Sequence, residues 1–312
     1  MRRAIEAVGD ALALHGPPVY VRRPIVHNLA VVRRLEALGA VFVHELEDVP
    51  RGAVVVLSAH GVCAEVARKA RERGLRVYDA VCPLVAKVHR EVRRHALARR
   101  HVVLIGHSGH PEIEGTLGQI PAGRASLIRH AKDVAALPFG PRERLAYAVQ
   151  TTFSVKEAAG VIGALKDRFA DLAGPSASDI CYATTNRQEA LGAIAPRADA
   201  IIVVGESFSS NAQRLVDVAS ATCARVQLVA DGAALDWGLL PPHGGTIGVT
   251  AAASTPDESV EDVLGTLAKA YDVSLVEVGG EVETARFHKV ALAAAGAGAP
   301  RARMRAPLPP RP

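Results

Sequence analysis

The sequence predicts an α/β protein built of pseudo-repeated lobes with mostly parallel sheets. Short β-branched runs alternate with amphipathic helical stretches along the chain, and this alternation is typical of α/β units around parallel sheets. The strand ends recur in two styles, which indicates a threefold pseudo-repeat of roughly 90 to 100 residues per lobe.

The expected elements follow from the apolar runs and the helix stops. The predicted strands are 17–22, 52–59, 75–81, 101–106, 145–150, 178–183, 199–205, 224–230 and 245–251. The predicted helices are 29–39, 64–73, 84–99, 155–171, 187–194, 211–221 and 257–270, and Gly39 and Gly74 are natural helix stops.

Polar residues gather where the predicted strands end. The strands in "VVVLSAHG", "VVLIGHSGHPEIEG" and "AIIVVGESFSSN" each lead into a loop of Gly, Ser, His or Asn. Because α/β sheets bind their ligands beyond the carboxyl ends of the strands, these loops predict a binding site.

Four predicted helices begin just after strands with a hydroxyl or amide residue, at Ser154, Asn186, Ser209 and Ser254. Each pattern fits a capping box or a similar start. Ordinary capping explains any one of them. Four together favour a phosphate or diphosphate site, since helix starts offer free N–H groups and a positive dipole end.

Composition and charge argue against several classes of protein. The net charge is +5, but the last twelve residues hold four arginines and no acid, which leaves +1 for the rest. This distribution argues against a nucleic-acid binder. No apolar run approaches the ~18 residues of a membrane helix, and the N-terminus does not resemble a secretory signal. We therefore expect a cytoplasmic protein with no membrane partner and a disordered Ala/Pro/Arg tail at 286–312.

The four cysteines are too dispersed for a local zinc or redox motif. The simplest interpretation of each is a small buried hydrophobe, and we keep it for Cys63 and Cys223. Cys181 is less ordinary, because the stretch "DICYATTNRQE" places it between an apolar run and a predicted helix.

Three histidines stand in loops at strand ends, His27, His60 and His110. Histidines in such places are more often packed or surface residues, and a dispersed zinc triad stays open as a rival. Glu112 follows His110 closely. In a closed site its pKa would rise, which suits it to deliver a proton, whereas in an open loop it is a solvated acid. We expect His107 to be structural.

Several stretches together resemble the 4-hydroxy-3-methylbut-2-enyl diphosphate reductase family, also called IspH or LytB. The resemblance covers roughly residues 2–282 in family order, and "GHPEIEGT" and "ICYATTNRQ" are its most distinctive parts. The other matching stretches are "YVRRPIVHN", "LSAHGV", "DAVCPLVAKVHREV", "QTTFSV", "SSNAQRL" and "GVTAAASTPD".

The resemblance implies a trefoil of three α/β lobes around a [4Fe-4S] cluster with one open iron, to which the substrate's hydroxyl binds. Two electrons, supplied by reduced ferredoxin or flavodoxin, and protons would remove that hydroxyl as water, giving isopentenyl and dimethylallyl diphosphate. The residues that match family positions are Cys82 and Cys181 as cluster ligands, Glu112 as proton donor, Thr151 near the substrate's alcohol, His110 as a substrate contact, and His27, His60, Ser209, Ser210, Asn211 and Ser254 around the diphosphate.

The sequence departs from the family pattern at its start. We expect lobes at 1–81, 82–178 and 179–285, the last without its first strand. The family's third cluster cysteine would lie three residues upstream of Met1. Either the start at Met1 is internal to a longer gene, or the chain is a truncated or degenerate relative. Two other functions therefore stay open, a cluster-free diphosphate-binding paralogue and a His-ligated metal hydrolase.

Overall fold

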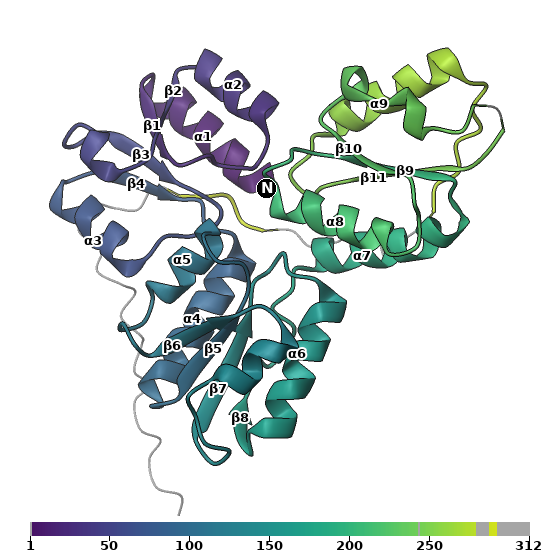
Figure 1. Ribbon diagram of the computed structural model, residues 1–312. Coiled ribbons are helices and arrows are strands. Elements are labelled where there is room, and N and C mark those ends of the chain that lie inside the picture. The colour runs from purple at the N-terminus through teal and green to yellow at the C-terminus, as the bar shows by residue number, and fades with distance from the viewer. Residues whose placement is uncertain (1, 243, 279–286, 292–312) are drawn as a thin grey trace, which may run out of the picture.

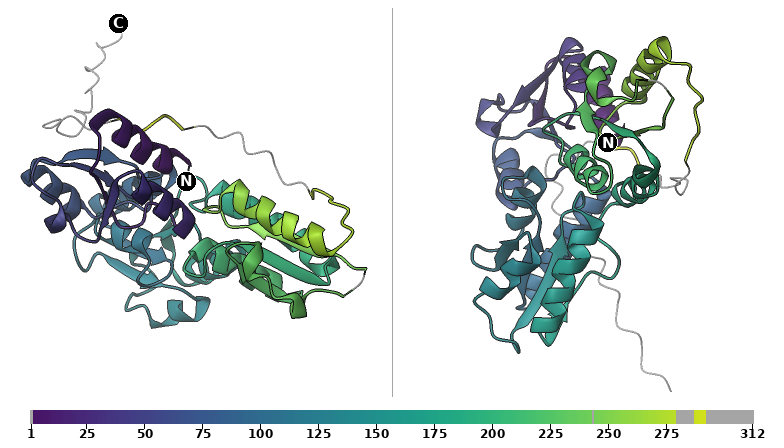
Figure 2. Two further views of the ribbon diagram at one scale, coloured as in Figure 1. Left: turned by 90° about the horizontal axis from the view of Figure 1, so that it is seen from above. Right: turned by 45° about the vertical axis from the view of Figure 1, so that its right-hand side comes forward.

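The computed structural model describes residues 2–242, 244–278 and 287–291, and these form three lobes (Figure 1). Each lobe holds one parallel sheet with helices packed against it. The two further views in Figure 2 show the same separation into lobes from other sides. The prediction of an α/β fold with parallel sheets is confirmed.

The first lobe has the sheet order β2-β1-β3-β4. Its central strands are β-branched and largely buried, because helices cover both faces of the sheet. The strands are β1 (Val19–Arg22), β2 (Ala40–Val43), β3 (Val54–Leu57) and β4 (Arg76–Asp79), and the helices are α1 (Arg2–His15), α2 (Leu29–Ala37) and α3 (Ala64–Glu72).

The second lobe repeats this plan with the order β6-β5-β7-β8. Helix α4 packs on one face of the sheet and helix α6 on the other. The strands are β5 (His101–Ile105), β6 (Ala125–Ile128), β7 (Arg144–Val149) and β8 (Asp171–Ala173), and the helices are α4 (Pro83–Leu97), α5 (Pro111–Leu117) and α6 (Val155–Arg168).

The third lobe has a three-stranded sheet in the order β10-β9-β11 among the residues described. Every residue of its central strand is buried. The strands are β9 (Ala200–Val204), β10 (Val226–Val229) and β11 (Ile247–Ala251), and the helices are α7 (Tyr182–Ile194), α8 (Ser210–Ser220) and α9 (Asp257–Ala270). Short 3₁₀ helices lie in loops of all three lobes, at Leu46–Asp48, Ala131–Ala136, Ala195–Arg197, Gly232–Ala234 and Trp237–Leu239.

The predicted strand at 178–183 is wrong. Cys181 is the N-cap residue of α7, which begins at Tyr182 rather than at 187. The apolar run before it is too short to pair, and the backbone N–H of Cys181 donates instead to the carbonyl of Thr151 (2.9 Å). Because α7 starts early, Asn186 lies inside the helix and is not a cap. The structure also adds elements that were not predicted, namely α1, α5, β2, β6 and β8.

Two of the four predicted caps are confirmed. Ser154 accepts from the N–H of Glu157, and Ser209 accepts from the N–H of Ala212. The cap predicted at Ser254 is wrong, because α9 begins only after Pro256 and has no side-chain cap. The neighbouring hydroxyl of Thr255 donates to the carbonyl of Val204 instead, which ties the loop to β9 (2.9 Å).

The segment 287–291 lies beside α1. Arg3 donates to the carbonyl of His288, and Lys289 pairs with Asp10 across 3.4 Å. The rest of the tail predicted at 286–312 lies outside the described residues. Within the described ranges, no helix has both the length and the apolar character needed to cross a bilayer.

Candidate active site

The parallel register of the strands places polar loops next to one another at one edge of each sheet. Leu57 pairs with both Arg22 and Asp79, so the loops after β1, β3 and β4 leave the same sheet edge. Ile105 pairs with Val149, and Val204 pairs with Ala251. These loops carry the residues predicted to form the site, so chain topology brings them together within each lobe.

The three strand-end histidines cluster, although they come from two lobes. The ring centroids of His27 and His60 are 4.4 Å apart, and that of His110 lies 5.9 and 5.8 Å from them. Nε2 of His27 and Nε2 of His60 are buried without a hydrogen-bond partner among the residues described. Buried polar atoms without partners are uncommon, so these two nitrogens mark a place where a ligand can bind.

The three imidazoles are neutral at physiological pH. Burial lowers the pKa of His27 and, together with the other two imidazoles, lowers that of His60 far more. Burial also lowers the pKa of His110 to about 4. His110 is the N-cap of α5, and its Nδ1 accepts from the N–H of Glu112 at 3.1 Å. The proton of the neutral ring is therefore on Nε2, which makes that nitrogen a donor.

Glu112 and Thr151 form a buried pair. One carboxylate oxygen of Glu112 accepts from the backbone N–H of Thr151 (2.6 Å), and the other accepts from its hydroxyl (2.7 Å). Glu112 is 2% exposed. Burial raises its pKa to about 7, against the opposing effect of the two hydrogen bonds. At neutral pH such a group both holds and releases a proton, which is the property of a general acid.

Backbone hydrogen bonds connect Cys82 to the loop of the histidine cluster and Cys181 to the Glu112–Thr151 pair. The N–H of Cys82 donates to Ala59 (2.9 Å), the neighbour of His60, and the N–H of Cys181 donates to Thr151 (2.9 Å). Each cysteine is a helix N-cap, Cys82 for α4 and Cys181 for α7. Burial raises the pKa of the Cys181 thiol; the amides of Ala183 and Thr184 oppose this rise, and the charge of Cys82 adds to it. The charge of one cysteine thus influences the other.

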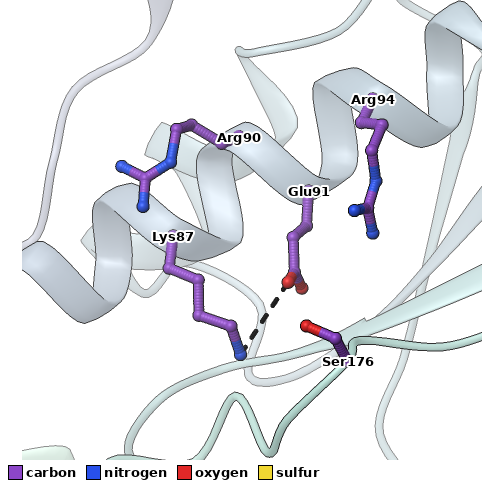
Figure 3. A pocket seen from close by; sticks show the side chains of 5 residues that line it. All are labelled: Lys87, Arg90, Glu91, Arg94 and Ser176. Carbon is purple, nitrogen blue, oxygen red and sulfur yellow. Dashed lines mark ion pairs between the residues drawn. The ribbon is translucent and has the colours of Figure 1, made fainter.

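Lys87 fixes the helix that begins at Cys82 to the segment that leads to Cys181. Its Nζ donates to the carbonyls of Ala177 (2.7 Å) and Ser178 (3.0 Å) and to Asp179 (3.1 Å), whose side chain is buried. Figure 3 shows Lys87 paired with Glu91 along α4, across 3.9 Å. The side chains drawn there, among them Arg90 and Arg94, line a cavity of about 260 Å³ along α4.

The third lobe contributes hydroxyl and amide groups. The hydroxyl oxygens of Ser209 and Ser254 are 3.5 Å apart, and Oδ1 of Asn211 accepts from the N–H of Ala253 (2.8 Å). A cavity of about 480 Å³ reaches across the lobes and is lined by His27, His110 and Ser210. Groups from all three lobes thus meet, and they can bind an anion with neutral donors.

The predicted site residues therefore gather, whereas the two remaining cysteines stand apart. Sγ of Cys223 contacts the carbonyls of Ala198 and Arg225, and Cys63 packs in the core of the first lobe against Gly118. Among the described parts of the chain, no three His, Cys, Asp or Glu side chains are arranged to hold a metal ion. The rival zinc triad of His27, His60 and His110 is thus not supported.

The two thiols fit part of the ligand set of an iron–sulfur cluster. Thiolates are the usual ligands of such clusters, and the positive ends of α4 and α7 favour the anionic group that a cluster with bound thiolates forms. Cys82 and Cys181 would hold two positions of the cluster.

A polar network that was not predicted from the sequence lies beside the site. Arg214 of α8 contacts His107, which contacts Gln150, which in turn contacts Thr152. These residues lie within the stretches "GHSGHPEIEG", "QTTFSV" and "SSNAQRL". The spacing of residues in the sequence does not indicate contacts between helices and loops that are so far apart in the chain.

Comparisons with known proteins identify relatives of this chain. The family model described as LytB protein matches residues 1–268. A 4-hydroxy-3-methylbut-2-enyl diphosphate reductase of Phenylobacterium zucineum (strain HLK1) is 48% identical over 287 residues, which cover 91% of this chain and 90% of that protein. The solved structure of the E-1-hydroxy-2-methyl-but-2-enyl-4-diphosphate reductase from Plasmodium falciparum superposes with a TM-score of 0.82 at 38% identity, covering 86% of this chain and 83% of that one. A second solved structure, of (E)-4-hydroxy-3-methyl-but-2-enyl diphosphate reductase, described as the terminal enzyme of the non-mevalonate pathway, gives a TM-score of 0.62 at 30% identity and covers 86% of this chain and 94% of that one.

Proposed function

Because the chain belongs to the LytB family, we propose that it reduces 4-hydroxy-3-methylbut-2-enyl diphosphate to isopentenyl and dimethylallyl diphosphate. This is the last step of non-mevalonate isoprenoid biosynthesis. The reaction takes two electrons and two protons and releases the substrate's hydroxyl as water. The family uses a [4Fe-4S] cluster, which supplies the electrons when it is bound.

The diphosphate end of the substrate binds among neutral donors. We assign this role to His27, His60, Ser209, Ser210, Asn211 and Ser254. Nε2 of His27 and Nε2 of His60 have no protein partner in the described part of the chain, so their N–H tautomers can donate to phosphate oxygens. Donors that carry no charge bind a dianion through hydrogen bonds and the dipole of α8.

The hydroxyl end of the substrate lies toward Glu112 and Thr151. A substrate that fills the cavity from Ser210 and His27 reaches His110, whose Nε2–H can donate to the substrate. The protonated carboxyl of Glu112 donates to the hydroxyl of Thr151, and that hydroxyl passes a proton to the departing oxygen. The observation on which this assignment depends is the buried Glu112–Thr151 pair, joined through the backbone to Cys181.

Cys82 and Cys181 are proposed as ligands of the cluster that delivers the electrons. The electron donor is proposed to be reduced ferredoxin or flavodoxin, both small acidic proteins. The exposed side of α4 suits such a partner, because it presents Arg90, Arg93 and Arg94 on the helix that begins at Cys82.

Anaerobic reconstitution tests the proposed function. The chain loaded with iron and sulfide should absorb broadly near 400 nm and should convert the substrate to the two products when an artificial reductant is present. Tight binding of diphosphate without iron would instead identify a cluster-free binding protein. Stoichiometric zinc with hydrolysis of the diphosphate would identify a metal hydrolase.

A further inference from the structure

A chain of hydrogen bonds runs from α8 through the second lobe and back to the start of α8. It begins at Arg214, passes through His107 and Gln150, and ends at the hydroxyls of Thr152 and Ser210. Ser210 lines the cavity that also touches His27 and His110. His107 and Arg214 line this cavity too, so both ends of the chain of hydrogen bonds reach the proposed diphosphate site.

The first link fixes the tautomer of His107. Nη2 of Arg214 lies 2.9 Å from Nε2 of His107. A guanidinium has only donors, so this Nε2 is the acceptor and carries no proton. The proton of the neutral ring is then on Nδ1, which faces Oε1 of Gln150 at 3.1 Å. Burial and the nearby charges of Arg214 and Arg129 lower the pKa of His107, which keeps the ring neutral.

The second link fixes the orientation of the Gln150 amide. The backbone N–H of His107 also donates to Oε1 of Gln150, at 2.9 Å. Because a backbone N–H can only donate, the atom that faces it is the amide oxygen and not the nitrogen. The amide nitrogen therefore points the other way, 2.8 Å from Oγ1 of Thr152 and 3.5 Å from Oγ of Ser210.

The last link decides where the hydroxyl protons point. Both hydroxyl oxygens accept from the amide of Gln150, so their own protons must be directed elsewhere. The two oxygens are 3.4 Å apart, and at most one O–H can be used between them. At least one O–H of the pair is thus not used between the two hydroxyls, and of the two residues Ser210 lines the cavity.

The network is rigid because its first member is buried and well anchored. The side chain of Arg214 is 7% exposed and also contacts Glu157 at 2.9 Å and Asp217 at 3.1 Å. Gln150 is 1% exposed. Two carboxylates offset the charge of Arg214, so its contribution to the site is the direction of its hydrogen bond rather than net positive charge.

We propose that His107 and Gln150 are positioning residues that orient the Thr152 and Ser210 hydroxyls, so that Ser210 donates to the substrate's diphosphate. Arg214 sets the direction of this relay, and the bound anion is its final acceptor. The proposal rests on the proposed function only in taking the ligand to be a diphosphate. It gives Gln150 and His107 roles other than packing.

Calorimetric titration of the full chain with inorganic pyrophosphate tests the relay. Gln150→Met keeps the length of the side chain and removes its donors, so the dissociation constant should rise about 10-fold, the loss expected for one hydrogen bond to a charged ligand. In turnover, KM for the substrate should rise by a similar factor while kcat changes much less. Gln227→Met is the matched control: Gln227 is a buried glutamine whose amide bonds the backbone of Asp236, and it is not among the described residues that line the cavity. This control should bind like the wild type.

The outcomes separate the two proposals. No binding of pyrophosphate to the wild-type chain would refute the proposed function. Wild-type binding that Gln150→Met leaves unchanged would refute the relay alone.

A second measurement does not depend on the folding of any variant. Nitrogen-15 spectra of the wild-type imidazoles, with the His107 signals assigned through the bonds that link the ring to its backbone, should show a proton on Nδ1 and none on Nε2. A His107 ring protonated on Nε2 would overturn the proposal.

Discussion

Replacing Glu112 with glutamine tests the proton donor and the buried environment that produces it. Burial raises the pKa of this carboxyl from its ordinary value of 4.5 to about 7. One pKa unit corresponds to about 1.4 kcal/mol, so the folded protein loses about 3 kcal/mol of stability when the group ionises. The sign follows from proton binding: the folded state holds this proton more tightly than the unfolded chain does. The contribution of the Glu112 carboxyl to the free energy of unfolding is thus complete below pH 4.5 and is lost as the pH rises toward 7.

The amide introduced by Glu112→Gln imitates the protonated carboxyl, because its oxygen can accept from the N–H of Thr151 and its nitrogen can donate to the Thr151 hydroxyl. The free energy of unfolding, measured with urea, should therefore fall between pH 5 and pH 8 in the wild type by about 2 to 3 kcal/mol more than in Glu112→Gln. The value of kcat should drop by roughly 10²- to 10⁴-fold, whereas pyrophosphate binding should be unchanged. Parallel pH profiles of stability in the two proteins would refute the buried-acid argument, and an unchanged kcat would remove Glu112 from the proton role.

Four further predictions concern the cluster ligands, their support, the anion site and the electron donor. Cys181→Ser should lower bound iron and sulfide to a small fraction of the wild-type content, measured after anaerobic reconstitution; equal iron in both proteins would contradict the assignment. Lys87→Met leaves the buried carboxylate of Asp179 without its cation. The free energy of unfolding, measured with urea at pH 8, should therefore fall by about 3 kcal/mol. A fall of less than about 0.5 kcal/mol would mean that the ion pair between Lys87 and Asp179 contributes little to stability. Ser209→Ala should raise the dissociation constant for pyrophosphate several-fold and cost about 1 kcal/mol of stability through the lost helix cap; normal binding by a destabilised variant would limit Ser209 to capping. Arg94→Glu should raise KM for reduced ferredoxin and leave the rate with an artificial reductant unchanged, and an equal effect on both rates would exclude α4 as the docking face.

The class of the fold could be predicted because its cause is local. Runs such as "VVVL" and "AIIVV" are fully buried strands in the structure, and the alternation of such runs with helical stretches predicts parallel sheets. The predicted strand at 178–183 failed for a non-local reason, because Cys181 is the N-cap of α7 and its N–H donates to the carbonyl of Thr151 in another loop. The pattern of apolar residues does not show that a carbonyl far away in the chain will accept the backbone hydrogen bond that a neighbouring strand would accept in a sheet.

The sequence by itself determined which residue types stand at the ends of strands, and its resemblance to a family named their roles. It could not determine their protonation. The raised pKa of Glu112 depends on burial, and the tautomer of His107 depends on a partner from another lobe. Burial also leaves one nitrogen each of His27 and His60 without a partner among the residues that the structure describes. Tertiary structure decided these properties, because the cost of a charge and the direction of a hydrogen bond depend on what surrounds a group in space and not on its neighbours in the chain.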